Sequence, residues 1–304
     1  MNYDCVVKGE NISKKFKTFT LDIPDLRVPK GFATALIGEN GAGKTTLLNM
    51  LSGIRLDYKG ELTFFDKYSS EEKERRADVK NRIGYTGTGR YYLPQWTVSD
   101  VEEISSLLFD NFDRDEFERY CRELAIFPDS PNGVALKKKC SALSDGTRTK
   151  LMLAGVMARD TDLLLLDEPA SPLDPLMRDK LCQMIGDYIS DGAGEKSVLF
   201  STHNISDMES ITDYAIIMEH GNVVECGFVE DLKEKYILIK GDAQDAEVAS
   251  NILYTMTKNP YGFEGICLAE NLDKLAGMNV SKEIPSLFQI SVAVMKNNTK
   301  MVLK

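Results

Sequence analysis

The stretch Gly38-Glu39-Asn40-Gly41-Ala42-Gly43-Lys44-Thr45-Thr46 decides the fold class of this chain. It matches the phosphate-binding pattern G-x-x-x-x-G-K-[ST] at every fixed position, and it lies between an apolar run at 33–37 and a helical pattern at 45–51. Glycines allow the backbone to wrap so that its N–H groups point at phosphate oxygens, and the following helix adds the positive end of its dipole. The residues expected to bind a nucleotide are Gly38, Asn40, Gly41, Ala42, Gly43, Lys44, Thr45 and Thr46.

Two side chains of this loop carry the expected chemistry. Lys44 is expected to reach the β- and γ-phosphates of a nucleoside triphosphate, and the Thr45 hydroxyl to ligate Mg²⁺. Kinases, GTPases and other enzymes share such a loop, so the activity has to be decided by the motifs that follow it.

The composition limits the partners that this chain can have. Its 304 residues, 43% of them hydrophobic, suffice for one large domain plus a small one, or for two domains. The formal net charge of −10 argues against a nucleic-acid partner, since such proteins usually carry a basic surface. There is no signal-peptide pattern and no apolar run near the about 20 residues that span a bilayer, so we expect any membrane role to need a partner chain. Six scattered cysteines favour reduced thiols in the cytosol.

Apolar runs that alternate with helical patterns predict an α/β fold. The run Leu163–Leu166, bounded by Asp162 and Asp167, is typical of a strand buried on both faces, as in a parallel sheet with helices on either side. Strands are expected at 5–17, 20–23, 61–65, 83–85, 197–201 and 214–219, helices at 98–125, 147–159 and 175–190, and a charged, solvated segment at 69–82. Within 98–125, Ser99-Asp100 is expected to supply a helix cap, and Asp113 is expected to cap a second helix.

The pattern changes after Gly227. We expect a domain boundary near Tyr236, because none of the motifs described here lies beyond it. Helices are expected at 229–235, 243–257 and 285–294, and strands at 236–240 and 265–269.

The leucine run leads directly into Asp167 and Glu168. The first carboxylate is expected to contact Mg²⁺, and the second to act as general base on the attacking water. A strand that ends in an ordinary solvated acidic turn is the alternative, and the phosphate loop makes it the weaker one.

Two further segments have the chemistry to meet a phosphate. Leu143-Ser144-Asp145-Gly146-Thr147 begins a helix about 20 residues before the Asp-Glu pair, and a helix N-terminus suits an anion. Ser144 and Gly146 are therefore expected to bind nucleotide. His203 follows a strand and can contact the γ-phosphate there, although a lone histidine is more often structural.

Together these motifs resemble the ATP-binding subunit of an ABC transporter, over about residues 6–227. The resemblance implies a P-loop, RecA-like core at 1–227 with an N-terminal antiparallel β-subdomain and a helical insert at about 93–159. It also implies a small α+β accessory domain at 236–304. The implied ligands are ATP and Mg²⁺, and the implied activity is ATP hydrolysis.

The resemblance also assigns roles to residues. It makes Glu168 the catalytic base, His203 the switch histidine and Lys44 the phosphate-binding lysine, and it places Phe16 where the family has an aromatic ring that stacks on adenine. An ordinary core position is the alternative for Phe16. Segment 143–147 resembles the signature that closes over the ATP of a second subunit, and 171–174 resembles the D-loop.

Three residues depart from the family pattern. The signature usually reads Leu-Ser-Gly-Gly-Gln, whereas Asp145 and Thr147 stand at two of its positions here. The Asp145 carboxylate is expected to weaken or reorient the contact with phosphate. Thr88 aligns with the Mg²⁺-sensing glutamine, so we expect it near the metal.

The resemblance implies a transmembrane permease subunit and a second ATPase subunit as partners, either a homodimer or a related chain. It also implies a place at the cytoplasmic, inner face of the cell membrane. Segments 91–96, 109–117 and 200–206 look similar to a bacterial export-type subgroup. Two alternatives stay open: a soluble ABC-class ATPase that acts on ribosomes or DNA, and a nucleotide-sensing module without useful turnover.

Overall fold

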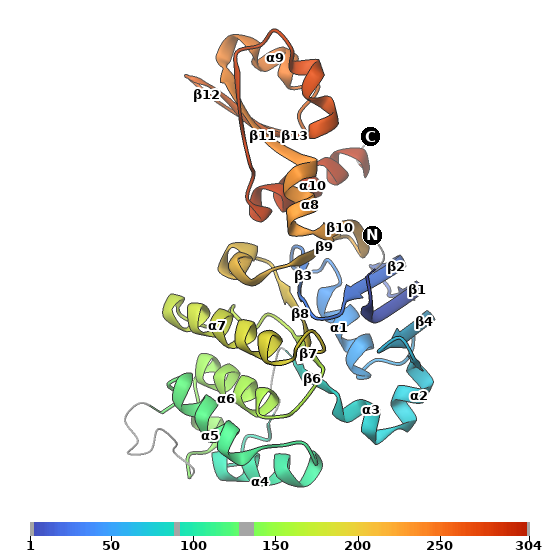
Figure 1. Ribbon diagram of the computed structural model, residues 1–304, viewed down its shortest axis with the longest axis vertical. Helices are drawn as coiled ribbons and strands as arrows, with labels where there is room; N and C mark the ends of the chain where they lie inside the picture. The colour runs from blue at the N-terminus through green and yellow to red at the C-terminus, as the bar shows by residue number, and fades with distance from the viewer. Residues whose placement is uncertain (1–2, 88–91, 128–136, 303–304) are drawn as a thin grey trace.

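The structure is a computed structural model that describes residues 3–87, 92–127 and 137–302, with side chains up to residue 298. Its centre is a six-stranded sheet with the order β10-β9-β3-β8-β7-β6 (Figure 1). The strands from β9 to β6 are parallel, and β10 pairs antiparallel with β9, so the predicted α/β class is confirmed. The strands are β3 (Ala33–Ile37), β6 (Ile83–Thr86), β7 (Leu163–Leu166), β8 (Ser197–Thr202), β9 (Tyr214–Glu219) and β10 (Asn222–Phe228).

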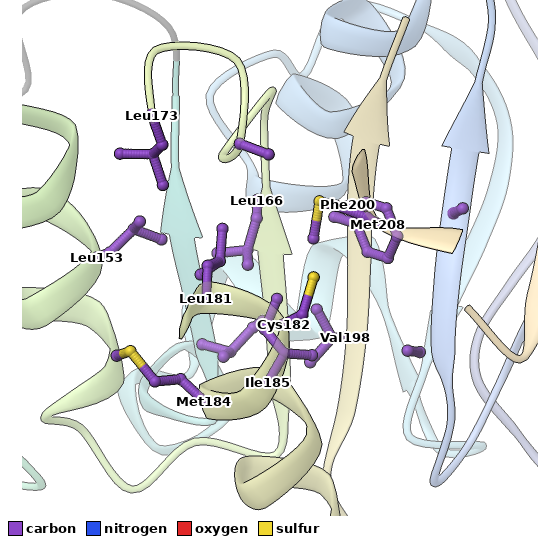
Figure 2. Packing of buried hydrophobic residues seen from close by; sticks show 14 of the residues in the cluster. Leu153, Leu166, Leu173, Leu181, Cys182, Met184, Ile185, Val198, Phe200 and Met208 are labelled. Carbon is purple, nitrogen blue, oxygen red and sulfur yellow. The ribbon is translucent and has the colours of Figure 1, made fainter. Parts of the chain in front are cut away.

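Both faces of this sheet are covered, because successive side chains of a strand point to opposite sides. The two odd-numbered leucines of β7 pack in a cluster with α1 (Lys44–Ser52), and the two even-numbered ones in a cluster with α7 (Pro175–Asp191). Figure 2 shows the second cluster between β7, β8 and α7. The buried leucine run therefore holds the strand rigidly up to Asp167.

A four-stranded antiparallel sheet, ordered β2-β1-β4-β5, covers the α1 side, which confirms the predicted N-terminal strands. The segment at 69–82 is mostly exposed, as expected of a charged, solvated segment, and it forms two short helices. Lys73 is buried there and donates to the carbonyl oxygen of Leu51 at 2.8 Å, in the last turn of α1. The elements are β1 (Cys5–Lys15), β2 (Thr20–Pro29), β4 (Lys59–Phe64), β5 (Tyr68–Ser69), α2 (Ser70–Arg75) and α3 (Ala77–Asn81).

Three helices form the insert in the lower left of Figure 1. They are α4 (Val98–Leu108), α5 (Arg114–Glu123) and α6 (Asp145–Met157), so the helical pattern at 98–125 contains two helices, as expected. The predicted cap Asp113 is confirmed, because its carboxylate accepts from the N–H of Glu116 at 3.0 Å. The cap of α4 is Thr97 rather than Ser99, and it forms a reciprocal pair of hydrogen bonds with Asp100.

The C-terminal region contains a separate antiparallel sheet, ordered β12-β13-β11-β14. The helix predicted at 243–257 is wrong. Only a short helix forms, because Thr255 begins a strand that turns at Asn259, whose side-chain oxygen accepts from the N–H groups of Tyr261 and Gly262, both at 2.9 Å. The elements are α8 (Val229–Lys235), β11 (Tyr236–Asp242), α9 (Ala246–Ala249), β12 (Thr255–Asn259), β13 (Gly262–Leu268), β14 (Val280–Glu283) and α10 (Leu287–Val302).

Helix α10 packs on the large sheet as well as on the C-terminal one. Leu287, Ile290 and Ala293 are fully buried in the same apolar cluster as β3, β7 and β8. The N–H of Leu287 donates to the Glu209 carboxylate at 2.8 Å. Among the described residues, the structure contains no helix with the length and hydropathy to cross a membrane. Short 3₁₀ helices are η1 (Cys140–Ala142), η2 (Ile205–Asp207), η3 (Glu209–Ile211), η4 (Ala243–Asp245) and η5 (Ala269–Leu275).

Candidate active site

The predicted strand, loop and helix around Lys44 are present as β3, residues 38–43 and α1. Gly43 begins the helix with φ 108°, and a Cβ there would lie 2.8 Å from Leu21 and 2.9 Å from Phe19, so only glycine fits. The Lys44 side chain is almost fully buried. Its ammonium donates to the carbonyl oxygens of Gly38 at 2.7 Å and Glu39 at 3.2 Å. The loop therefore surrounds a fixed positive charge.

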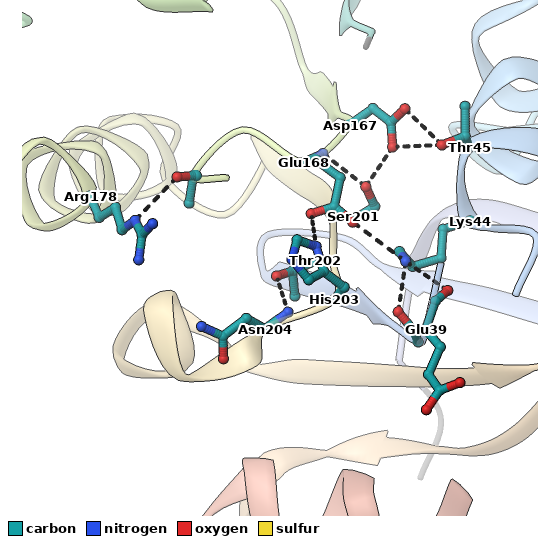
Figure 3. Close-up of polar contacts among 12 residues, drawn as sticks. Glu39, Lys44, Thr45, Asp167, Glu168, Arg178, Ser201, Thr202, His203 and Asn204 are labelled. Atoms are coloured by element: carbon teal, nitrogen blue, oxygen red, sulfur yellow. Dashed lines mark hydrogen bonds and ion pairs between the residues drawn. The ribbon is translucent and has the colours of Figure 1, made fainter. Parts of the chain in front are cut away.

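Asp167 and Thr45 meet beside this lysine, as Figure 3 shows. The Thr45 hydroxyl donates to the Asp167 carboxylate at 2.9 Å and 3.2 Å, and that carboxylate is buried. Asp167 directly follows β7, and Thr45 lies in the first turn of α1. Because parallel strands all end at the same edge, two residues that are 122 positions apart come together here.

Glu168 lies between Lys44 and His203. One of its carboxylate oxygens is 3.4 Å from the Lys44 ammonium, and the other is 2.8 Å from His203 Nδ1. The backbone of Glu168 has φ 50°, a left-handed conformation that is uncommon for residues other than glycine. The structure thus brings together Lys44, Thr45, Asp167, Glu168 and His203, from the ends of β3, β7 and β8.

Ser201 also belongs to this group, although it was not predicted as a site residue. Its hydroxyl donates to Asp167 at 2.6 Å and accepts from the Glu168 N–H at 2.9 Å. The pairing of β7 with β8 matches Leu166 to Phe200, so Ser201 lies next to Asp167 in register. Without the strand order, nothing in the sequence distinguishes this serine from any other.

A cavity of about 490 Å³ extends from the loop to Phe16. The Phe16 ring lies 5.7 Å from the ring of Phe19 and 5.2 Å from the Arg55 guanidinium. Phe16 thus lines the cavity that Lys44 and Thr45 line, and Phe19 is a second aromatic residue there, which was not predicted.

The start of α6 lies across a second cavity, of about 470 Å³, from Asp167, Glu168 and His203. Asp145 and Arg148 line it and form an ion pair at 2.9 Å, with the Asp145 side chain 89% exposed. Ser144 caps α6 by accepting from the Thr147 N–H at 3.1 Å. Ser144 and Gly146 line neither of these two cavities, so this chain does not bring them to its own Lys44. Thr88 lies outside the described residues.

Comparisons with known proteins agree with this geometry. Residues 21–171 match the family model described as ABC transporter. The chain is 28% identical over 226 residues to the energy-coupling factor transporter ATP-binding protein EcfA2 of Lactococcus lactis, covering 71% of this chain and 74% of that protein. It is also 28% identical over 267 residues to an uncharacterised ABC transporter ATP-binding protein of Nostoc, covering 87% of this chain and 77% of that protein.

The fold is similar to that of the ATP-binding cassette MJ0796, solved as a dimer in a post-hydrolysis state with ADP and phosphate. The TM-score is 0.61 at 20% identity, and the match covers 73% of this chain and 98% of the other.

Proposed function

Because this chain belongs to the ABC transporter family as an ATP-binding subunit, we propose that its ATP lies across the loop at 38–46 and is hydrolysed at Glu168. The chain binds and hydrolyses ATP, and it drives transport through a separate transmembrane subunit, together with a second ATPase subunit. The observation that carries the proposed site is the convergence of Lys44, Thr45, Asp167, Glu168 and His203 at one edge of the sheet.

The nucleotide is proposed to bind along the cavity from Phe16 to Lys44. The Phe16 ring offers a π face for the adenine, with Phe19 beside it. Backbone N–H groups of Gly41 to Thr46 and the start of α1 bind the phosphates, and Lys44 pairs with the β- and γ-phosphates. Such charge-assisted hydrogen bonds are the strong ones.

The donor atoms beside the phosphates fit Mg²⁺. The Thr45 hydroxyl and the Asp167 carboxylate are adjacent oxygen donors, and Mg²⁺ prefers a few protein oxygens completed by phosphate and water. We propose that these two residues hold the ion, with Thr88 as a further candidate from the alignment. When bound, Mg²⁺ neutralises charge that develops on the phosphate oxygens.

Hydrolysis requires a base that accepts a proton from the attacking water. Glu168 is proposed for this step, since its carboxylate lines both cavities beside the phosphate loop and lies within 3.4 Å of the Lys44 ammonium. His203 donates to one carboxylate oxygen, which orients the other towards the side of Lys44. The same histidine can contact the γ-phosphate, so the base and the phosphate share one positioning group.

Ser144 and Gly146 are proposed to act on the ATP of the second subunit. They lie at the N-terminus of α6, and in the proposed two-fold dimer this end of the helix closes over the partner's phosphate loop. ATP between the subunits favours the closed dimer by mass action, and its hydrolysis removes that preference. Asp145 puts a negative charge at this contact, partly offset by Arg148.

Four finer assignments are part of this proposal. The ATPase domain covers 1–227 with its helical insert at about 93–159, the accessory domain covers 236–304, and the chain lies at the cytoplasmic face of the membrane. The relatives reported above are an energy-coupling factor subunit and an uncharacterised ABC ATPase, so the narrower export-type resemblance stays a prediction.

The test is steady-state phosphate release by the purified chain and by Glu168→Gln. The variant keeps the shape of the site but loses the base, so we expect normal ATP affinity, turnover lowered by about 10²-fold or more, and an ATP-dependent dimer in light scattering. Glu103→Gln, on the exposed side of α4, is the control and keeps wild-type turnover. Wild-type turnover in Glu168→Gln contradicts the proposed mechanism.

A further inference from the structure

We infer that Ser201 is a positioning residue for ATP hydrolysis, because its single hydroxyl fixes both carboxylate-bearing residues of the site at once. The inference rests on the roles proposed above for Asp167 and Glu168. The hydroxyl donates its one hydrogen to Asp167 at 2.6 Å, and its oxygen accepts from the Glu168 N–H at 2.9 Å. Ser201 is fully buried. Figure 3 shows the serine between the two residues.

A serine hydroxyl has one donor and two acceptor sites, so it can make both bonds together. At a position that is fully buried, water cannot replace either bond at low cost. Thr45 donates to the same Asp167 carboxylate from the side of the phosphate loop. The described contacts of this carboxylate include one from α1, through Thr45, and one from β8, through Ser201.

The contact with Glu168 concerns the backbone. Glu168 has φ 50°, a conformation disfavoured for a residue with a Cβ, so the surrounding contacts must hold it there. In this conformation its N–H points at Ser201, while its side chain points at His203 and Lys44. We therefore expect that loss of the hydroxyl lets the backbone of Glu168 relax and moves its carboxylate away from the attacking water.

This role predicts a specific kinetic change. Catalytic groups have to be held within about 0.5 Å of the productive geometry, whereas the contacts proposed for the adenine and the phosphates come from other residues. Ser201→Ala is therefore expected to lower kcat by about tenfold or more while the KM for ATP stays within about twofold.

The chain offers a matched control in the same strand. Ser197 is also fully buried in β8, and its hydroxyl also accepts one backbone N–H, that of Gly31 at 2.9 Å. It lies at the opposite end of the strand from Asp167. Ser197→Ala removes one buried bond where Ser201→Ala removes two, so it should also lower the Tm, by less, and leave kcat unchanged.

The experiment compares kcat, KM and Tm for wild type, Ser201→Ala, Ser197→Ala and Ser201→Thr, with Mg²⁺-ATP as substrate. We expect kcat to fall in Ser201→Ala but not in Ser197→Ala. We expect a kcat near that of the wild type in Ser201→Thr, which retains the hydroxyl. Should Ser201→Ala not fold, Ser201→Cys, which is close in size and a weak donor, is expected to show the same split between kcat and KM.

Wild-type kcat in Ser201→Ala overturns the inference, and so does an equal loss of kcat in both alanine variants. Glu168→Gln is measured in parallel. If it has lost turnover while Ser201→Ala has not, the proposed function stands and only the role of Ser201 is wrong.

Discussion

The six-stranded sheet and the four-stranded C-terminal sheet differ in where their strands end and in what the polar residues at those ends do. In the first, β3, β7 and β8 are parallel, so all three end at one edge, and their polar residues meet there. In the second, every pair is antiparallel, so consecutive strands end at opposite edges. Polar end residues such as Asp242 and Asn259 serve turns and local contacts there. A converging site is thus a property of the parallel arrangement.

The ATP site and the C-terminal region also differ in the interactions that stabilise them. The ATP site depends on buried charges that contact each other and the loop backbone. The C-terminal region depends on apolar contacts, including the face of α10 that packs against the large sheet. Substitutions in α10 should therefore lower the stability of the fold without changing ATP affinity. Substitutions in the phosphate loop should weaken ATP binding and leave the stability of the fold unchanged.

Among the single substitutions, the largest effect is expected for Ile290→Ala in α10. Ile290 is fully buried in the shared cluster, and truncating such a side chain costs about 2–5 kcal/mol of unfolding free energy. Urea unfolding measures the change, and calorimetric titration at low temperature should give an unchanged Kd for ATP. Ile284→Ala is the control, because Ile284 is 77% exposed, and its change should stay within about 0.5 kcal/mol. A loss of ATP affinity in folded Ile290→Ala would show that the two regions are coupled.

Lys44→Ala should lower ATP affinity and leave the stability of the fold unchanged, the opposite of Ile290→Ala. Removing this charge is expected to weaken ATP binding at least about tenfold, or about 1.4 kcal/mol, while the fold is retained. Calorimetric titration is the measurement, with Lys59→Ala on the exposed surface of β4 as control. Unchanged affinity in Lys44→Ala is incompatible with the assignment of this loop.

The smallest effect is expected at Asp145. In the Glu168→Gln background, Asp145→Gly should lower the ATP concentration needed for dimer formation by a few-fold, about 0.5–1 kcal/mol, because a negative charge is removed from the contact with phosphate. Asp145→Asn separates charge from size and should give a similar shift. Light scattering across an ATP series measures both. If neither variant changes the midpoint, Asp145 does not face the partner's phosphate.

Deletion of residues 236–304 tests whether ATP binding depends on the C-terminal region. The C-terminal segment contains none of the ATPase motifs, so a truncated chain that folds should bind ATP with wild-type affinity. The structure adds a condition, since truncation also uncovers the surface that α10 buries. Ending the chain after Lys235 should therefore lower its stability sharply, and differential scanning calorimetry beside the titration tests both statements. Loss of binding in a folded product would mean that the boundary or the role is wrong.

Much of the site could be predicted because its residues occur in short motifs with fixed spacing. Lys44 and Thr45 lie in one loop, and Asp167 and Glu168 follow a four-leucine strand. Ser201 could not be predicted, because its role depends on which strands are neighbours, and strand order is not a local property. The same holds for Lys73, whose side chain is buried against α1 although most of the charged segment around it is exposed.

The C-terminal region was predicted less well for a related reason. The residues at 243–257 have a composition suited to a helix, yet pairing of Thr255–Asn259 with β13 prevails over that local preference. Nothing in the local pattern shows that α10 contacts β9 and η2, since the partners lie about 70 to 80 residues earlier.

The contact of α10 with the large sheet also affects folding during synthesis of the chain. Helix α10 packs on β9, at the edge of the apolar cluster that runs from Ala33 to Val294, so this part of the cluster can be covered only after α10 has left the ribosome. With synthesis at about 5–20 residues per second, the residues of β9 that α10 covers wait at least about four seconds with an uncovered apolar face. The nascent chain needs protection from aggregation during that interval, and a strain that lacks ribosome-associated chaperones should accumulate this protein in insoluble form.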